Sequence, residues 1–588
     1  MKRFIQRPLA FFTHHLNSWQ KQMHDRSIME TARNRALMAS GFFLLAFIVI
    51  GIRLFDVMIF HSHFKVKFTD LDHMSKASIK RADILDRNGE ILATHLITGS
   101  VYANPKVIIN ADEAALKLSK LFPDLSYETL QRKLASDKGF VWVVRHIPPK
   151  MQQEVNRLGV PGIYIQQDER RVYPHGNLVS HALGYCGIDN DGLGGVEQYF
   201  DARLRKDPTS LRLSVDVRAQ HVVREELIHA MTEFRAVGAN SMIVDAITGE
   251  MIAMVSLPDF DPNLPTQNSV EATFNRNTLG TYECGSVFKI FNTAIALESG
   301  KATLTSHYDA SVPLKVGNRK VTDFKAKNRV LDVSEVFRYS SNIGSAKMAL
   351  DFGGEVQRQY LGRFGMLTAP KLEVHEIGHP TVPKHWSDAT TVTVSYGYGI
   401  SVSHLMLIDG IRTVVKGHKK YATTLLKRTD EISFEDDKNL RVVSEKTSAA
   451  LRDLMRSVVA DGAGLANAPG YDVIGKTGTA YKNNGRRGYD VNDRNCTWVG
   501  AFPKDDPKYI LLVGLDNPKA TKTTHGYATA GWNAAAVAGR IISRFAPLMG
   551  VQPVQTYGNG KAGEIQMLKH TVEMGDTIDT DTIYDDEG

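Results

Sequence analysis

A serine and a lysine three residues apart, Ser286 and Lys289, are the pair in this chain best placed for nucleophilic chemistry. They open an apolar run that ends at Gly300 and predicts a helix over 286–299, buried nearly all round. Residues i and i+3 share one face of a helix, so the hydroxyl and the amine can meet. A lysine whose pKa is lowered by burial or by a second cation can take the proton of a serine hydroxyl. The pair predicts acyl transfer through a serine nucleophile with a lysine base.

The Ser-x-x-Lys spacing is informative only together with other motifs, because it is expected roughly two or three times by chance in a chain of this length. It recurs at Ser18 and at Ser62, far from any predicted site. A second motif, Ser340 and Asn342, offers a hydroxyl and an amide within a predicted helix over 333–351. This motif lies in the same half of the chain as Ser286 and Lys289, so one site could use the two motifs together.

A third motif, Lys476-Thr477-Gly478-Thr479, follows the apolar residues of a predicted strand. Alternate residues of a strand face the same way, so Lys476 can point into a cleft. Gly478 would allow a ligand to approach the backbone closely. The stretch 470–477 also matches a phosphate-binding loop, but such a loop must follow a strand and open a helix, and neither flank fits. We therefore exclude nucleotide binding.

Composition describes an ordinary globular chain of 588 residues, with 43% hydrophobic and 23% charged residues, which is room for two or three domains. The net charge of +7 is no signature of nucleic-acid binding. Cys186, Cys284 and Cys496 match no zinc or redox pattern and cannot all pair. Which of them pair, if any, stays open at this stage.

A membrane anchor is predicted near the N-terminus. Residues 1–35 are basic, and 36–52 form an uncharged apolar run of roughly 25 Å if helical. Basic residues before the run place the N-terminus in the cytoplasm and the bulk of the chain in the periplasm. A cleaved signal peptide would need a small-residue site after the run, and Arg53-Leu-Phe-Asp provides none. A buried soluble helix is the other alternative. We expect a single-pass protein of the cytoplasmic (inner) membrane.

The remaining chain divides into two parts by its sequence pattern. Up to about residue 235 the pattern predicts short strands, turns and helices at 112–135 and 148–158, and from about residue 236 it is an α+β pattern. The later part has a hairpin near 239–256 and predicted strands at 472–475, 496–502 and 508–515, with a last helix near 528–546. We expect five segments: a basic N-terminus (1–35), an anchor (36–60), a pedestal domain (61–235), a catalytic domain (236–548) and an acidic tail (549–588).

In this order, Ser-x-x-Lys, Ser-x-Asn and Lys-Thr-Gly resemble the motifs of penicillin-binding proteins and serine β-lactamases. The segment starting at Arg81, the stretch Arg171-Val-Tyr-Pro-His-Gly and Leu183-Gly-Tyr resemble the pedestal of class B penicillin-binding proteins. Ser395-Tyr-Gly-Tyr-Gly resembles the septum-building branch, penicillin-binding protein 3, more than the elongation branch. Cys284 stands where this family usually has proline. The region 53–240 shows no acidic glycosyltransferase motif, which speaks against a bifunctional class A enzyme.

The resemblance implies a fold: an α+β protein with one transmembrane helix, an elongated pedestal and a transpeptidase domain like that of serine β-lactamases, in which helices cover both sides of an antiparallel sheet. It also implies a reaction. Ser286 would attack the carbonyl between two D-alanines of a peptidoglycan stem peptide, and Lys289 would take its proton. An amine of a neighbouring strand would then accept the acyl group, and β-lactams would acylate Ser286 in place of the peptide. No metal or cofactor is expected.

The other motif residues receive roles from the same resemblance. Ser340 would relay the proton to the leaving amine, and Asn342 would hold Lys289 and the substrate. Lys476 would lower the pKa of Lys289 and attract the terminal carboxylate. Thr477 and Thr479 would donate hydrogen bonds to that carboxylate, and the expected substrate-binding residues are Thr477, Gly478 and Thr479. The backbone N–H groups of Ser286 and Thr479 would form the oxyanion hole.

The expected partners are peptidoglycan stem peptides, β-lactam antibiotics, a septal glycosyltransferase and other division membrane proteins, with no nucleic acid. Three alternatives stay open. The first is an elongation-type transpeptidase. The second is a hydrolase or sensor of β-lactams on the same fold, although the sequence shows no Glu-x-x-x-Asn loop of the class A β-lactamase kind. The third is a catalytically idle division scaffold.

Overall fold

The computed structural model describes residue 33 and residues 37–52, 81–317, 319–418, 421–429, 440–461, 464–483 and 488–553. These fall into two units, 1–78 and 79–588. The predicted basic N-terminus (apart from residue 33), the predicted end of the anchor at 53–60 and the acidic tail beyond residue 553 lie outside the described residues.

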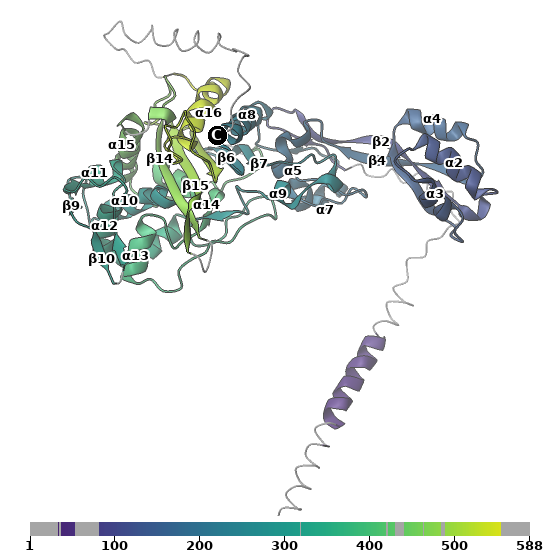
Figure 1. Cartoon of the computed structure of the whole chain (residues 1–588), viewed down its shortest axis with the longest axis horizontal. Coiled ribbons are helices and arrows are strands. Elements are labelled where there is room, and N and C mark those ends of the chain that lie inside the picture. The colour runs from purple at the N-terminus through teal and green to yellow at the C-terminus, as the bar shows by residue number, and fades with distance from the viewer. Residues whose placement is uncertain are drawn as a thin grey trace, which may run out of the picture. The chain divides into compact units, whose positions relative to one another are not determined.

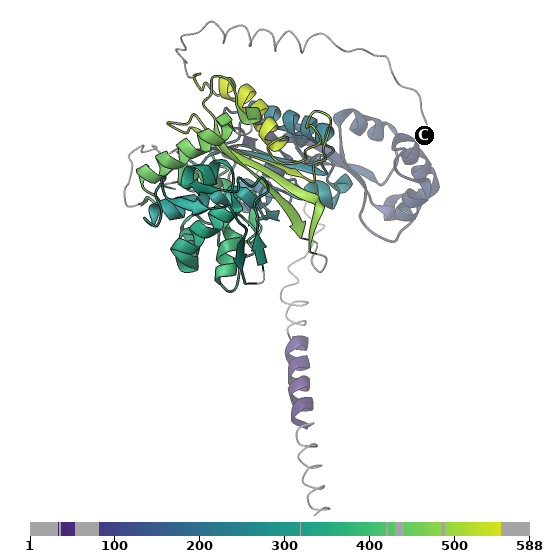
Figure 2. The same cartoon turned by 60° about the vertical axis from the view of Figure 1, so that its left-hand side comes forward.

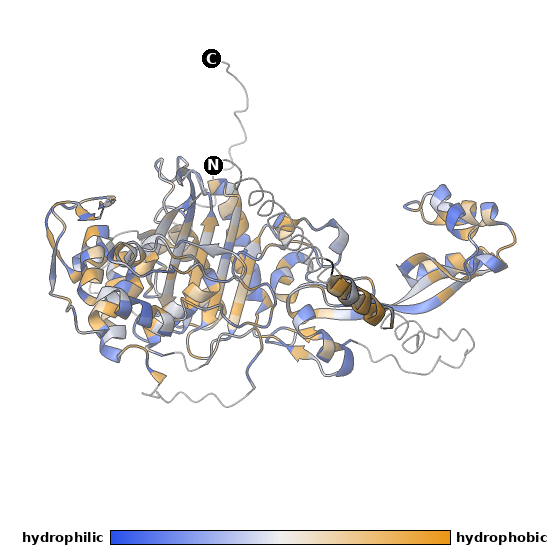
Figure 3. Ribbon diagram, turned by 90° about the horizontal axis from the view of Figure 1, so that it is seen from below, coloured by the Kyte–Doolittle hydropathy of each residue, from blue (hydrophilic) through white to orange (hydrophobic). Residues whose placement is uncertain are grey.

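In the first unit, residues 37–52 form one helix whose residues are mostly hydrophobic (Figure 3). Within the described ranges, no helix reaches both the length and the hydropathy that crossing a membrane requires. The anchor over 36–60 therefore stays a prediction.

The pedestal part of the second unit is built on a five-stranded sheet. Its long strands β2 (Ile91–Ala103) and β4 (Ile163–Val172) pair antiparallel and lie side by side (Figure 1). The strand β3 (Val141–Ile147) pairs with β2 on its other side, and the short β1 (Ile84–Leu85) pairs with both β2 and β5 (Leu211–Arg212). The sheet thus joins segments from both ends of the pedestal sequence.

Three helices pack with these strands around a small apolar core: α2 (Ala111–Leu121), α3 (Tyr127–Leu134) and α4 (Pro149–Arg157). The single helix predicted over 112–135 is wrong, because the chain breaks between α2 and α3. Pro123 cannot continue the hydrogen-bond pattern of α2, and the Ser126 side chain caps the first turn of α3. The break places the two helices against each other as an antiparallel pair around Leu118 and Leu130.

The second half of the unit contains an antiparallel sheet in the order β14-β15-β16-β6-β7 (Figures 1 and 2). The strands are β14 (Ile474–Asn483), β15 (Tyr489–Phe502), β16 (Tyr509–Asp516), β6 (Gly238–Asp245) and β7 (Met251–Leu257). The hairpin and late strands of the prediction are thus present, and β14 and β15 are longer than expected. β14 is an edge strand that pairs with a strand on one side only, and the 3₁₀ helix η6 (Gly285–Phe288) packs against it.

Helices cover both faces of this sheet, as the family resemblance implies. Helices α8 (Val217–Phe234) and α16 (Ala534–Leu548) share one apolar core with Leu511 and Val513 of β16. Helices α10 (Lys289–Glu298) and α14 (His404–Lys416) share the other core with Ile510 and Leu512. The two faces divide along β16 because successive strand residues point in opposite directions.

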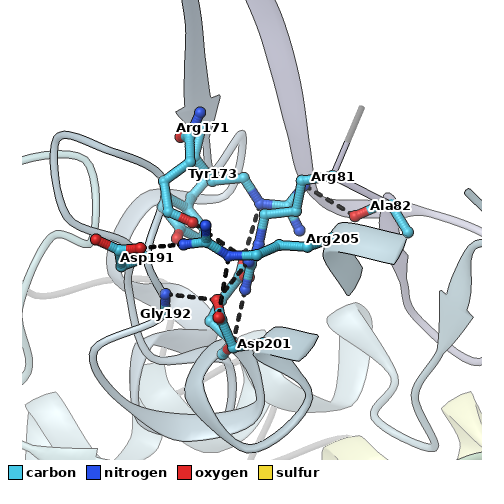
Figure 4. Close-up of polar contacts among 10 residues, drawn as sticks. Arg81, Ala82, Arg171, Tyr173, Asp191, Gly192, Asp201 and Arg205 are labelled. Carbon is cyan, nitrogen blue, oxygen red and sulfur yellow. Dashed lines mark hydrogen bonds and ion pairs between the residues drawn. The ribbon is translucent and has the colours of Figure 1, made fainter. Parts of the chain in front are cut away.

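A buried ion cluster joins three distant segments of the pedestal (Figure 4). Glu197, in helix α6 (Gly195–Tyr199), is completely buried and accepts from Arg81 Nε at 2.7 Å and from Arg171 Nε at 2.6 Å. Arg81 also donates to Asp201 at 2.7 Å. The segments at Arg81 and Arg171 stood out in the sequence, but nothing in their spacing indicated that Glu197 would neutralise both. This cluster fixes the start of the pedestal sheet, the end of β4 and α6 together.

Substituting Glu197 by alanine is expected to lower the free energy of unfolding by about 3–5 kcal/mol, because two buried arginines lose their counter-ion. Chemical denaturation of the full chain measures the change. The control Glu154→Ala removes an exposed partner of Arg157, which is worth at most about 1 kcal/mol. Equal losses of unfolding free energy in the two variants would contradict a stabilising role of the buried cluster.

Candidate active site

Lys289 is the centre of the site that the three motifs form. It begins α10, directly after the 3₁₀ helix η6 (Gly285–Phe288) that carries Ser286. Its side chain is completely buried, and its Nζ lies 3.0 Å from Ser286 Oγ. The same nitrogen lies 2.7 Å from the Ser340 carbonyl oxygen, 3.1 Å from Ser340 Oγ and 2.7 Å from Asn342 Oδ1. One amine therefore contacts the first two motifs at once.

Lys476 brings the third motif to the same place. It lies on the edge strand β14, its side chain is buried, and its Nζ donates to Ser340 Oγ at 3.1 Å. The Ser340 hydroxyl thus stands between two amines. The structure brings together Ser286, Lys289, Ser340, Asn342 and Lys476, as the sequence predicted.

The electrostatics of the two amines differ from those of surface lysines. Burial, with the positive charge of Lys476 as a second cause, holds the pKa of Lys289 well below its usual range, although Asp323 opposes the shift. Burial lowers the pKa of Lys476 to about 8. The stronger effect on Lys289 makes it the amine of the pair that loses its proton first as the pH rises. A neutral amine 3.0 Å from a serine hydroxyl can accept its proton.

The predicted continuous helix over 333–351 is wrong at the site itself. Helix α11 (Val333–Arg338) ends before Ser340, which has a positive φ of 58°, and α12 (Asn342–Arg363) starts after it. Ser341 caps α12 and donates to Asp323 Oδ2 at 2.7 Å. Left-handed backbone is unfavourable for serine and is typical of functional sites held by their surroundings. The break lets both the hydroxyl and the carbonyl of Ser340 face Lys289.

The two threonines of the third motif are placed differently from the lysine. Thr477 and Thr479 alternate with Lys476 along β14, and both are half-buried. The Thr479 hydroxyl accepts from the Ala530 N–H at 3.0 Å. Among the described residues, neither threonine side chain bonds to the other motif residues. Their predicted part in carboxylate binding remains a prediction.

Family comparisons agree with this geometry. The model of the penicillin binding protein transpeptidase domain matches residues 240–543, more than half of the chain. The chain belongs to the penicillin-binding protein transpeptidase family. The penicillin-binding protein dimerisation domain matches residues 76–228.

Individual relatives span most of this penicillin-binding protein. It is 34% identical over 485 residues to the probable peptidoglycan D,D-transpeptidase FtsI of Caulobacter vibrioides, covering 80% of this chain and 82% of the relative. It is 28% identical over 492 residues to the peptidoglycan D,D-transpeptidase FtsI of Escherichia coli, covering 78% and 82%. A crystal structure of a peptidoglycan synthetase from Bifidobacterium adolescentis shares the fold, with a TM-score of 0.63 at 18% identity, covering 82% of this chain and 97% of that one.

Residues that the sequence analysis missed support the site of this penicillin-binding protein. Asp323 fixes the Ser-x-Asn motif by accepting from Ser341 Oγ and from the Ile343 N–H at 2.9 Å. The Thr322 carbonyl accepts from Asn342 Nδ2 at 3.0 Å. Both lie in an irregular segment without periodicity, so the sequence carried no signal for them. Cys284, beside the nucleophile, is buried and free, as are the other two cysteines.

Gly478 has a structural reason that the sequence did not indicate, and its predicted place in substrate binding remains a prediction. A Cβ at this position would lie 2.1 Å from the Cys284 carbonyl oxygen, so the close approach is made by the protein's own backbone. On the other side of that contact, Gly285 has a φ of 53° and donates its N–H to the Gly397 carbonyl at 3.2 Å. The absence of side chains at Gly478 and Gly285 lets β14 pack against the Ser286 segment, because a Cβ at Gly285 would lie 2.8 Å from the Thr479 carbonyl oxygen. The loop at 395–399 approaches the same segment at Gly397, where a Cβ would lie 2.1 Å from the Gly285 carbonyl oxygen.

The substitution Gly478→Ala is expected to slow acylation by penicillin at least about tenfold, because overpacking by about 1–3 kcal/mol falls on the segment that carries Ser286. Fluorescent penicillin labelling over time measures it. The control Gly139→Ala meets open space and should leave labelling unchanged. Unchanged labelling of the Gly478 variant would show that β14 does not pack tightly against the segment that carries Ser286.

Proposed function

We propose that this chain is a septal peptidoglycan D,D-transpeptidase, anchored in the cytoplasmic membrane by one helix, that cross-links stem peptides through an acyl-enzyme on Ser286. The observation that carries the proposal is the contact of one buried amine, Lys289 Nζ, with Ser286, Ser340 and Asn342. Both named relatives are peptidoglycan D,D-transpeptidases called FtsI, which supports the septal role. A septal glycosyltransferase and other division membrane proteins are the partners we propose.

Acylation follows from the distances. Neutral Lys289 takes the proton of Ser286, whose oxygen attacks the carbonyl between the two D-alanines. The proton then passes over 3.1 Å to Ser340 and on to the leaving D-alanine amine. Lys476 keeps the pKa of Lys289 low and offers a positive charge to the terminal carboxylate of the peptide. These roles of Ser340 and Lys476 remain part of the proposal.

Two backbone N–H groups are proposed to stabilise the tetrahedral intermediate. Ser286 lies in η6, and Thr479 lies on the edge strand β14, which packs against η6 at Gly478. Donors fixed in this way are worth about 3 kcal/mol each in comparable sites. An amine then attacks the ester, forms the new peptide bond and releases Ser286.

Ser286→Ala is expected to abolish covalent labelling by fluorescent penicillin while the thermal unfolding of the chain stays unchanged, because only the attacking oxygen is removed. Labelling is read by gel fluorescence and by the mass of the intact chain. Ser299→Ala, after the end of α10, is the matched control and should label normally. Persistent labelling of the Ser286 variant would overturn the assignment of the nucleophile.

The rate of penicillin acylation is expected to be bell-shaped in pH. It rises as Lys289 loses its proton, and this happens well below the usual pH range of a lysine because the pKa of Lys289 is lowered. It falls near pH 8, where Lys476 loses its charge. In Lys476→Gln the rising limb should move to higher pH, since the cation that lowers the pKa of Lys289 is gone. Stopped-flow acylation rates test this, with the exposed Lys301→Gln as control. A rising limb at the same pH in wild type and in Lys476→Gln would contradict the effect of the Lys476 charge on the pKa of Lys289.

A further inference from the structure

The second step of the proposed reaction poses a problem of charge. The hydrogen-bond network around Ser286 consists of Lys289, Lys476, Ser340 and Asn342, which include two amines and no carboxylate. The acceptor is itself an amine and carries a positive charge at neutral pH. A cationic site repels it, and an ammonium has no lone pair for attack. An acidic group near the nucleophile would solve both difficulties.

Asp323 does not meet this need. Its Oδ2 accepts from Ser341 Oγ at 2.7 Å, and its Oδ1 accepts from the Ile343 N–H at 2.9 Å. Both oxygens are thus occupied in capping α12 and holding the Ser-x-Asn segment. This carboxylate is a structural support of the site.

Glu283 has the free oxygen that Asp323 lacks. It lies three residues before Ser286, between strand β8 (Thr281–Tyr282) and η6, and is half-buried. Its Oε1 accepts from the Gly399 N–H at 2.7 Å and from the Tyr489 hydroxyl at 3.0 Å. Among the described residues, no group donates to its Oε2. The carboxylate is therefore held by one oxygen and open at the other.

The same contacts tie Glu283 to the nucleophile. The Gly285 N–H donates to the Gly397 carbonyl, so the loop at 397–399 is joined both to the backbone beside Ser286 and to the Glu283 carboxylate. This double connection fixes the carboxylate relative to Ser286. The sequence analysis gave Glu283 no role, because its contacts come from segments more than a hundred residues away.

The surroundings of Glu283 suit a cation. The rings of Tyr398 and Tyr489 lie edge to face at 5.3 Å, and aromatic rings attract ammonium groups. Among the described residues, the titratable groups around Glu283 include these two tyrosines and the neighbouring Cys284 thiol, and burial raises the pKa of Tyr398 and of Cys284, which keeps both neutral near pH 7. Burial raises the pKa of Glu283, while the bonds from Gly399 and Tyr489 oppose the shift. The carboxylate is therefore a stronger base than one on the surface.

We propose that Glu283 Oε2 binds the ammonium group of the acceptor strand and takes its first proton, which makes Glu283 a catalytic residue of the transfer step. This inference rests on the proposed function. The substrate that it concerns is the second one, a primary ammonium group on a stem peptide. Acylation of Ser286 does not need it.

The step balances in atoms and charge. The ammonium gives one proton to Glu283 Oε2 and becomes a neutral amine. Its nitrogen attacks the ester carbon on Ser286, the C–N bond forms and the C–Oγ bond breaks. The second proton of the amine reaches Ser286 Oγ through Lys289, and Glu283 later releases its proton to water.

The test is Glu283→Gln in the full-length chain, because the amide oxygen can still accept from Gly399 and Tyr489. A benzoyl-D-alanyl thioester serves as donor, and either D-alanine or hydroxylamine as acceptor, at pH 7. D-Alanine is an ammonium at this pH, whereas hydroxylamine is largely neutral.

We expect transfer to D-alanine, relative to hydrolysis, to fall at least about tenfold. Transfer to hydroxylamine and labelling by penicillin should remain within about twofold of the wild type, a change too small to involve general-base catalysis. Glu355→Gln, an exposed glutamate of the same domain, is the matched control.

Equal losses with both acceptors, a comparable loss of penicillin labelling, or no loss at all would overturn the role of Glu283. So would a wild-type chain that is acylated by the thioester but never transfers to D-alanine. Failure of the proposed function looks different: neither the thioester nor penicillin would acylate the wild-type chain, and the inference would fall with it.

Discussion

The burial of one lysine amine is the interaction on which the site depends. Lys289 is completely enclosed, and desolvation makes its charged form expensive, so the amine is poised to receive a proton. Its oxygen neighbours come from η6, from the turn between α11 and α12, and from Asn342 at the start of α12. The fold must bring these segments together around Lys289, and this requirement explains the left-handed residue at Ser340.

The protein contains two buried charge arrangements that work in opposite ways. In the pedestal, Glu197 meets two arginines with short hydrogen bonds, and the charges compensate one another. In the transpeptidase domain, Lys289 and Lys476 lie on either side of one hydroxyl with no carboxylate between them. Compensated charges hold segments together, whereas the uncompensated charge of Lys476 lowers the pKa of Lys289. The first arrangement is structural, and the second affects the protonation of Lys289.

Close backbone contacts connect the reactive amines to the rest of the cleft. Gly478 and Gly285 let the edge strand approach the Ser286 segment, and Gly397 lets the loop at 397–399 approach it. The same loop holds Glu283, whose Oε1 accepts from the Gly399 N–H. With Lys289 as the base for the serine and Glu283 as the proposed base for the incoming ammonium, one site would serve both halves of a transfer reaction.

The sequence by itself determined the three motifs and the late antiparallel sheet, because these follow from residue types at short spacing and from apolar periodicity, and the motifs carried the family resemblance that implied helices on both sides of the sheet. It predicted that the five polar residues of the site meet, as the distances show, but it read the Ser340 segment as a continuous helix and gave no sign of the backbone contact at Gly478. Glu197, Asp323 and Glu283 were beyond its reach. Each acquires its role from partners distant in the chain, and only the tertiary structure decides which buried charges meet.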